Sequence, residues 1–202
     1  MDYKVTLSDG TEIWLNAESK IEFPKSFSNE GRHVKLSGEA YFKVARDEKR
    51  PFLVSTSRMD VRVLGTEFNL KSYAKEPAML SLVNGSVEIM KHGSSKVEAL
   101  LKPGQTAMAQ ANIPIKLVAA DIYGAVQWKD GFFYFDEKPI VEILKELARW
   151  YNMGVIISRK APQRFRVHFS ASKADDIRQT ISNLNDVSKH KVSIEGRNLV
   201  IR

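Results

Sequence analysis

The stretch from Gly38 to Asn69 limits what this chain can fold into more than any other part of the sequence. It contains three short runs rich in aromatic and β-branched residues, separated by polar residues, glycine and proline. These runs, which are predicted to be strands, are residues 41–44, 52–54 and 61–63. Gly65 interrupts what would otherwise be one strand over residues 61–70, which predicts a β-bulge or the close approach of another backbone.

Turn signals on both sides continue the β pattern. The pair Asp9-Gly10 lies between apolar runs, and both residues tolerate positive φ, so a hairpin is predicted there. Asn84-Gly85 predicts a second hairpin in the same way. With further apolar runs up to residue 118, we predict roughly nine or ten strands at spacings of about 8–12 residues. This spacing, without a helical period, favours a β-sandwich, a jelly roll or a β-solenoid.

The periodicity changes after Trp128 and becomes helical. The apolar residues of one predicted helix face are Ile140, Ile143, Leu144, Leu147, Ala148 and Tyr151. A second helix is predicted to open at a capping box from Ser172 to Asp175 and to turn Ile177, Ile181 and Leu184 inward. The predicted strands around the helices are residues 132–135, 155–157, 166–169, 192–194 and 199–201.

Two domains follow from this change of period, because domains commonly hold about 100–150 residues. We expect an all-β domain over residues 1–122. We expect a small α/β domain over residues 123–202, built from two strand–helix–strand units and a closing strand.

The order and spacing of these motifs resemble the periplasmic part of FecR-family anti-sigma regulators, over nearly the whole chain. The motifs that carry the resemblance are Gly38-Glu-Ala-Tyr-Phe-Lys-Val44, Pro51-Phe-Leu-Val54, Val63-Leu-Gly-Thr-Glu-Phe-Asn69, Leu7-Ser-Asp-Gly-Thr11, Val83-Asn-Gly-Ser-Val87, Leu101-Lys-Pro-Gly-Gln105 and Trp128-Lys-Asp-Gly131. The arrangement of residues 130–202 is similar to the short N-terminal (STN) signalling module of secretins and TonB-dependent receptors.

The resemblance implies a sensor that relays the state of a TonB-dependent outer-membrane receptor to an extracytoplasmic-function (ECF) sigma factor. The implied partners are the receptor's signalling domain, the sigma factor through a cytoplasmic segment outside this sequence, and periplasmic or membrane proteases. The implied location is the periplasmic part of a single-pass inner-membrane protein. The sequence leads almost directly into a strand and has no run of about 18 apolar residues, so we expect it to be a piece of a longer protein.

A substrate or cofactor site finds little support in the sequence. The chain has no cysteine, which excludes disulfides and thiolate metal sites. The histidines are far apart in sequence, and no nucleophile-elbow, phosphate-loop or dinucleotide motif occurs. We therefore expect a protein that is not an enzyme and needs no metal and no cofactor.

The Gly65-Thr66 bond carries one candidate reaction. The Thr66 hydroxyl lies next to the carbonyl of a residue that can adopt strained backbone angles, as an N-to-O acyl shift followed by ester hydrolysis requires. The alternative is that Gly65 makes a bulge and Thr66 fills a strand position, since the sequence identifies no base. Self-cleavage would give a fragment that begins at Thr66.

The candidate partner-binding residues lie in the second domain. Trp150 falls beside the apolar helix face, which makes it a candidate interface residue. Leu199 and Ile201 lie on a predicted strand that is a candidate edge for strand addition. The basic group around Pro162, either an acidic-partner surface or a solvated loop, is Arg159, Lys160, Arg164 and Arg166. Residues 126–202 hold 14 basic and 9 acidic residues, so they carry +5 of the net charge of +7.

Two other functions stay open. A carbohydrate- or polymer-binding β-sandwich would expose aromatic side chains such as Trp14, Tyr41 and Phe42 as stacking platforms, whereas a regulator would bury them. Nucleic-acid binding would use the positive net charge. The basic residues are scattered and no RNA-binding signature occurs, so we expect no nucleic-acid partner.

Overall fold

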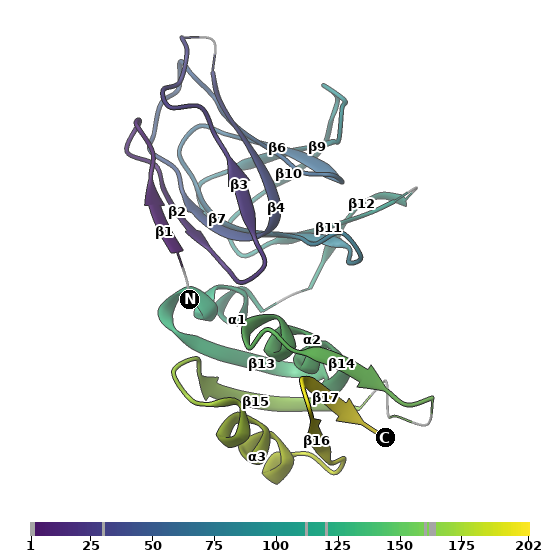
Figure 1. The fold of residues 1–202 in the computed structure, drawn as a ribbon. Helices are drawn as coiled ribbons and strands as arrows, with labels where there is room; N and C mark the ends of the chain where they lie inside the picture. The colour runs from purple at the N-terminus through teal and green to yellow at the C-terminus, as the bar shows by residue number, and fades with distance from the viewer. Residues whose placement is uncertain (1–2, 30, 112, 120, 160, 162–164) are drawn as a thin grey trace. The chain divides into compact units, whose positions relative to one another are not determined.

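The computed structural model describes residues 3–29, 31–111, 113–119, 121–159, 161 and 165–202. It divides into two compact units, Met1–Val126 and Gln127–Arg202 (Figure 1). Each unit has its own cluster of buried apolar side chains. Unit 1 is built from strands, and unit 2 is a smaller α/β region.

Unit 1 consists of twelve strands joined in one hydrogen-bonded sheet, followed by a short helix. The elements are β1 Tyr3–Thr6, β2 Glu12–Leu15, β3 Lys20–Glu22, β4 Arg32–Lys43, β5 Phe52–Ser55, β6 Met59–Val63, β7 Glu67–Ser72, β8 Ala78–Asn84, β9 Val87–Lys91, β10 Val97–Leu101, β11 Thr106–Gln110, β12 Ile113–Val118 and α1 Ile122–Val126. The main path runs β10-β9-β6-β5-β4-β7-β8-β11-β12, while β2 and β3 also pair with β4, and β1 pairs with β2.

The long strand β4 joins the two halves of this sheet. Its first residues pair with β5 and β3, and its last residues pair with β7 and β2. The change of partners occurs near Gly38, which has a φ of +104° and where a Cβ would lie 2.4 Å from the Ser19 Oγ. Glycine is required because it alone combines this backbone conformation with such a close approach. The sheet is therefore able to curve around one interior until β10 and β12 come close to one another (Figure 1).

The interior of unit 1 is filled by the apolar residues that alternate along the strands. Phe42 on β4 stacks on Phe68 of β7, with ring centroids 4.9 Å apart, and also packs edge-on against Phe52 of β5. All three side chains are fully buried. The all-β prediction for this part of the chain, including strands at residues 41–44, 52–54 and 61–63, is confirmed.

The predicted hairpin at Asp9-Gly10 is confirmed, because β1 and β2 pair from Thr6 and Glu12 outward. The predicted hairpin at Asn84-Gly85 is wrong. The strand before this turn pairs with β7 and β11, whereas the strand after it pairs with β6 and β10. The turn is a crossover between the two halves of the sheet. Turn chemistry describes the local bend of the chain and does not decide which strands pair.

Unit 2 contains two helices and two small sheets. Its elements are the 3₁₀-helix η1 Gln127–Asp130, β13 Phe132–Pro139, α2 Ile140–Trp150, β14 Gly154–Ile157, β15 Arg166–Ser172, α3 Ile177–Val187, β16 Val192–Glu195 and β17 Asn198–Ile201. β13 pairs with β15 in antiparallel fashion, and the second sheet has the order β14-β17-β16 with β14 parallel to β17. The predicted order of strands and helices is confirmed, but the two strands of each strand–helix–strand unit lie in different sheets.

The helices of unit 2 bury the faces that their periodicity predicts. All five of the predicted apolar residues that fall within α2, from Ile140 to Ala148, are buried. Ile181 and Leu184 are buried in α3. The predicted capping box at Ser172 is wrong, because Asp176 is the N-cap and its carboxylate accepts hydrogen bonds from the backbone N–H groups of Arg178 and Gln179. Ser172 lies at the end of β15.

Candidate functional site

The Gly65-Thr66 bond lies where the chain crosses between the two halves of the sheet in unit 1. β6 ends at Val63 and β7 begins at Glu67, and they have different partners. The second crossover, at Gly85, lies against the first: a Cβ on Gly85 would be 2.9 Å from the Thr66 Oγ1 and 3.0 Å from the Gly65 carbonyl oxygen. The two crossovers together form a packed corner, which we call the crossover corner and define as residues 64–66 and 84–86.

Gly65 occupies the most crowded position of the crossover corner. A Cβ there would lie 2.7 Å from both the Cα and the Cβ of Arg46, on the loop that follows β4. Because one of these atoms belongs to the backbone, a larger residue could not be accepted without moving the loop. The prediction that Gly65 marks the close approach of another backbone is confirmed.

The Thr66 side chain forms a hydrogen bond inside the crossover corner. It is buried, and its hydroxyl donates a hydrogen bond of 2.9 Å to the Ser86 carbonyl oxygen. The Thr66 carbonyl accepts a 3.0 Å bond from the Val44 backbone N–H. These contacts account for Thr66 as a structural residue of the crossover. Self-cleavage at this bond stays a prediction.

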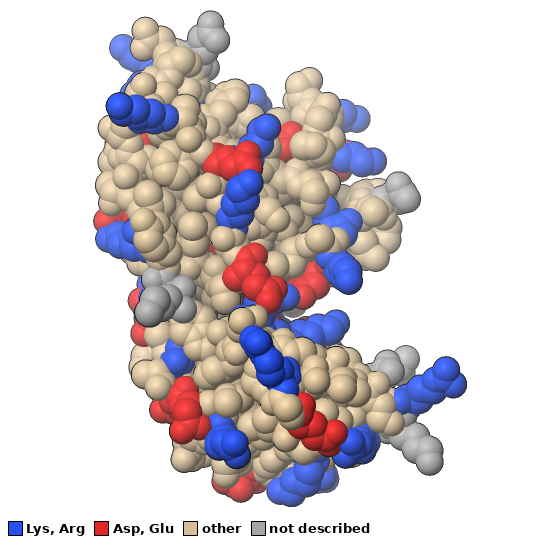
Figure 2. Space-filling model, in the orientation of Figure 1, with Lys and Arg blue, Asp and Glu red and all other residues tan. Residues whose placement is uncertain are grey.

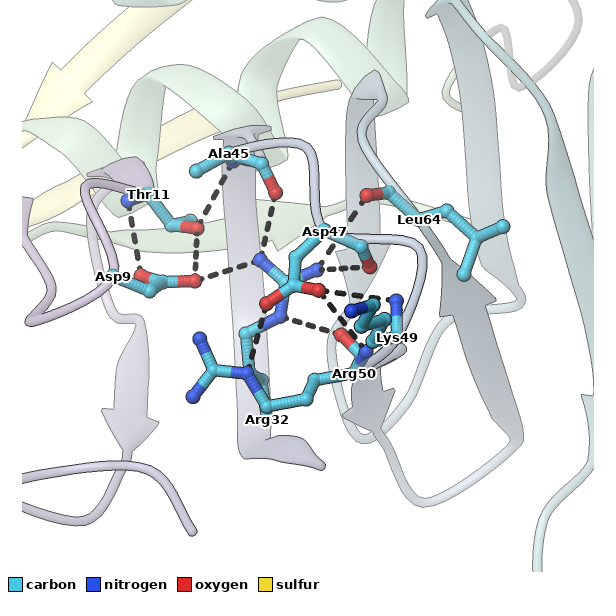
Figure 3. A network of polar contacts seen from close by, with 8 residues as sticks. All are labelled: Asp9, Thr11, Arg32, Ala45, Asp47, Lys49, Arg50 and Leu64. Atoms are coloured by element: carbon cyan, nitrogen blue, oxygen red, sulfur yellow. Dashed lines mark hydrogen bonds and ion pairs between the residues drawn. The ribbon is translucent and has the colours of Figure 1, made fainter. Parts of the chain in front are cut away.

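A fully buried arginine holds the loop that contacts Gly65 (Figure 3). The Arg32 guanidinium forms a 2.8 Å ion pair with Asp9 and donates hydrogen bonds to the carbonyl oxygens of Ala45 and Arg50, at 2.7 and 2.8 Å. It also lies 3.5 Å from the Leu64 carbonyl oxygen. The guanidinium group carries several N–H donors in a rigid planar arrangement, so it can bind several carbonyl oxygens at the same time. One side chain thereby ties the β1–β2 turn, the loop after β4 and the residue before Gly65 together.

Asp47 organises the outer part of the same loop (Figure 3). Its carboxylate forms an ion pair of 2.8 Å with Arg50 and accepts hydrogen bonds from the backbone N–H groups of Lys49 and Arg50. The hydrogen bond from the Arg50 side chain lowers the pKa of Asp47 below its ordinary value, and the backbone donors add to this. The charged carboxylate is therefore the form that the loop favours.

In unit 2, the predicted interface residue Trp150 is half-buried and has internal partners. Its indole N–H donates to the Lys173 carbonyl oxygen, and the Lys173 ammonium lies 3.8 Å from the ring centroid. Lys173 is itself buried, lies near the Trp128 and Phe133 rings, and donates to the Trp128 carbonyl oxygen. This arrangement anchors η1 to β15 and α2. A role of Trp150 in partner binding stays a prediction.

The other predicted partner residues fall in two groups. Arg159 and Arg166 are exposed, and the Arg166 guanidinium donates to the Glu137 carbonyl oxygen. Lys160, Pro162 and Arg164 lie outside the described residues. Leu199 and Ile201 are fully buried, and their strand β17 is the central one of its sheet, paired with β14 and β16. The predicted edge is therefore wrong, because both sides of β17 already carry hydrogen bonds.

A groove on unit 2 was not predicted from the sequence. It has a volume of about 460 Å³ and lies between the β13–β15 pair and α3. Its lining includes Tyr134, His168 and Val187, of which Tyr134 is 38% and Val187 56% exposed. Phe132, two residues before Tyr134 on the same strand face, is 50% exposed. The sequence signal for this surface was the run of four aromatic residues at 132–135, because a strand places alternate residues on opposite faces and two of the four therefore lie away from the core.

His168 lies in this groove with a carboxylate at each ring nitrogen. Its Nδ1 contacts Asp136, and its Nε2 lies 2.7 Å from Glu137. Both carboxylates belong to the irregular part of β13, where Glu137 has a φ of +48°. Because Asp136 contacts one ring nitrogen and Glu137 the other, the three side chains do not converge on one point as the ligands of a metal ion would.

The aromatic residues that could have served as sugar-stacking platforms are not exposed in a row. Tyr41 and Phe42 are buried, and the Trp14 ring packs edge-on against Tyr41 at 5.6 Å. This is the arrangement expected of a regulator. Among the described residues, no group of His, Asp and Glu could hold a metal ion, and no helix is long and apolar enough to cross a membrane.

Two family models match the chain. The model described as FecR protein matches residues 2–88, and the model described as FecR, C-terminal, matches residues 132–201. Two crystal structures of a candidate anti-sigma factor from Parabacteroides distasonis are similar over 100% of this chain. The first has 27% sequence identity and a TM-score of 0.87 over 94% of its own chain, and the second has 28% and 0.86 over 93%. A comparison with curated proteins finds no match.

Proposed function

Because this chain belongs to the FecR family of regulatory, non-enzymatic, membrane-anchored anti-sigma factors, we propose that it is the periplasmic sensing region of such a regulator. In this role it binds the signalling domain of a TonB-dependent outer-membrane receptor. It passes the state of that receptor to an ECF sigma factor through a cytoplasmic segment outside this sequence. Periplasmic or membrane proteases act on the regulator during this relay.

The observation that carries the proposal is the agreement of both units with one type of protein. The two FecR models match unit 1 and unit 2 separately, and a candidate anti-sigma factor aligns with the full length of the chain. A stacking-platform function has less support, because Tyr41 and Phe42 are both buried.

Unit 2 supplies the surface that we assign to the receptor. Its groove combines exposed aromatic side chains with charged residues at its edge, and aromatic residues commonly anchor protein interfaces. Phe132 and Tyr134 project from one face of β13 beside the groove, and Arg166 lies on the neighbouring strand β15. A backbone edge is also available at β14, which among the described strands pairs with β17 alone and carries the half-exposed Ile156. This edge replaces the one predicted at residues 199–201.

The proposal is tested by titrating the purified full chain with purified signalling domains of TonB-dependent receptors from the same genome, using calorimetry. One of these domains is expected to bind. Phe132→Ala and Tyr134→Ala should each weaken binding by about tenfold or more, as expected for interface anchors. The matched control is Phe23→Ala, which removes an aromatic ring of similar exposure from unit 1 and should leave the affinity unchanged.

Two negative outcomes have different meanings. If none of the signalling domains binds, the receptor relay is wrong. If one binds and both variants retain the affinity, the relay stands and the assignment of the groove on unit 2 is wrong. Circular dichroism of each variant checks that the fold is retained.

A further inference from the structure

We propose that unit 1 has a second docking site, at the open end of its sheet, where the free edge of β10 accepts an extended segment of a partner protein that alternates apolar and acidic side chains. This site is on a different unit from the receptor surface and does not depend on the proposed function. It also requires no self-cleavage.

The first observation is that the sheet of unit 1 stops short of closing. Among the described strands, β10 pairs with β9 alone and β12 pairs with β11 alone, so each has one side without strand partners. The two strands nevertheless come close to one another. The space between them is a groove of about 510 Å³ whose lining residues are Lys91, Lys96, Val97, Glu98, Ile113, Pro114 and Ile115. Unpaired strand edges bind extended peptides through backbone hydrogen bonds.

The second observation concerns which of the two edges is open to a strand. β12 contains Pro114, which has no N–H to donate and is a common means of blocking an edge. β10 contains no proline, so the backbone N–H groups on the side away from β9 are all present. Its side chains are also unusually apolar for an edge: Val97 is 39% and Leu100 is 60% exposed. The edge of β10 is therefore the one that accepts a strand.

The third observation concerns the apolar side chains where the interior of unit 1 opens between β10 and β12. Ala99 of β10 and Ile115 of β12 are partly buried and pack against the core of unit 1 from the two sides of the opening. A strand placed beside β10 would direct every second side chain toward these residues and the others toward solvent beside Leu100. Apolar side chains at alternate positions of the partner would extend the existing core.

The fourth observation sets the charge of the partner. Two lysines, Lys91 and Lys96, line the groove together with one acidic residue, Glu98. Neither lysine forms an ion pair with another described residue. Basic side chains also gather on the surface of unit 1 around β9, β10 and β12 (Figure 2). Such lysines repel a second basic edge and attract a strand with carboxylates, so they select the partner by charge.

The experiment uses the full chain and a blocked ten-residue peptide in which valine and glutamate alternate. Its affinity is measured by NMR titration, and hydrogen exchange locates the site. We expect binding that slows amide exchange in residues 97–101 and that weakens as salt is added. The double variant Lys91→Glu, Lys96→Glu should bind at least tenfold more weakly. The matched control Lys75→Glu reverses an exposed charge on the β7–β8 turn and should bind as the unaltered chain does.

Two further peptides test the chemistry of the site. A peptide in which lysine replaces glutamate should bind at least tenfold more weakly. A peptide methylated at alternate backbone nitrogens should lose binding, because it keeps its charges but cannot form the edge hydrogen bonds. The proposal is overturned if the first peptide does not bind at millimolar concentration, if protection occurs in a strand other than β10, or if the methylated peptide binds equally well. Binding of heparin or DNA with no protection of β10 would identify a nonspecific basic surface and would also overturn it.

Discussion

Arg32 holds together the β1–β2 turn, the loop after β4 and the residue before Gly65. It is fully buried, it faces one carboxylate, and its other donors point at backbone carbonyl groups that have no regular strand partner. A buried charge is costly unless it is paired and hydrogen-bonded. The Arg32 network satisfies this requirement, and it thereby fixes the loop that contacts Gly65.

Replacing Arg32 should therefore destabilise unit 1 strongly. Arg32→Met keeps much of the side-chain volume but leaves the Asp9 carboxylate buried without its cation, and we expect a loss of about 3–5 kcal/mol in the free energy of unfolding. Urea unfolding followed by circular dichroism measures this loss. The control is Arg46→Met on the same loop, whose side chain is 78% exposed and which should change stability by less than about 0.5 kcal/mol. A similar loss in both variants would contradict the role given to Arg32.

Asp47 should contribute to stability in a pH-dependent way. Its pKa is lowered in the folded chain by the Arg50 side chain and by backbone donors. The contribution is therefore complete above the unfolded pKa of about 4 and is lost as the pH falls through the lower folded pKa. Asp47→Asn should be less stable than the unaltered chain at pH 7, and the difference should shrink below about pH 4. Urea midpoints between pH 7 and pH 3 test this, and a gap that does not change with pH would refute it.

The Gly65-Thr66 bond should stay intact in the purified protein. The Thr66 hydroxyl is already donated to the Ser86 carbonyl oxygen, and the described contacts of Thr66 include no carboxylate or imidazole that could act as a base. We expect intact-mass spectrometry to give a single species of about 22.9 kDa after prolonged incubation. Two fragments, one of which begins at Thr66, would show that the acyl shift occurs. Thr66→Val would then abolish the cut.

At the scale of single elements, the local sequence predicts some features and the tertiary structure decides others. The hydrophobic period of α2 predicts its buried face correctly, because the period depends on helix geometry alone. The start of α3 is less well determined, since Ser172 and Asp176 are both residues that cap helices. Ser172 pairs with Phe132 in the β13–β15 sheet and therefore belongs to a strand, so it is not the N-cap of α3.

The N-cap of α3 can be identified by mutation. Asp176→Ala removes the acceptor for the N–H groups of Arg178 and Gln179, and we expect a loss of about 1 kcal/mol in the stability of unit 2. Ser172→Ala removes one hydrogen bond to the Ala174 N–H on an exposed turn and should cost less than about 0.5 kcal/mol. Thermal unfolding of both variants tests this. A larger loss of stability for Ser172→Ala than for Asp176→Ala would contradict the assignment of Asp176 as the N-cap.

At the scale of the whole molecule, the chain builds two separate interiors. Among the described residues, no buried side chain belongs to both clusters: the cluster of unit 1 ends at Ala109, and that of unit 2 begins at Phe133. Separate cores allow each unit to fold by itself. A regulator made in this way can bind different partners with its two units.

Residues 127–202 should therefore fold when they are produced alone. We expect a dispersed amide NMR spectrum whose peaks overlay those of the same residues in the full chain, because the α2 and α3 faces and the aromatic contacts of Lys173 all lie within unit 2. Peaks near the junction at Val126 should shift the most. A collapsed spectrum for the fragment would show that unit 2 depends on unit 1.

The sequence by itself determined the class of each part, the turn at Asp9-Gly10, the inward face of α2 and the close approach at Gly65, because each of these follows from local geometry and side-chain chemistry. The tertiary structure alone decided which strands pair. It turned Asn84-Gly85 into a crossover, placed β17 in the middle of its sheet and brought Arg32 against loops up to 32 residues away. The physical reason is that strand pairing and burial depend on contacts between distant segments, and a local pattern does not specify its distant partner.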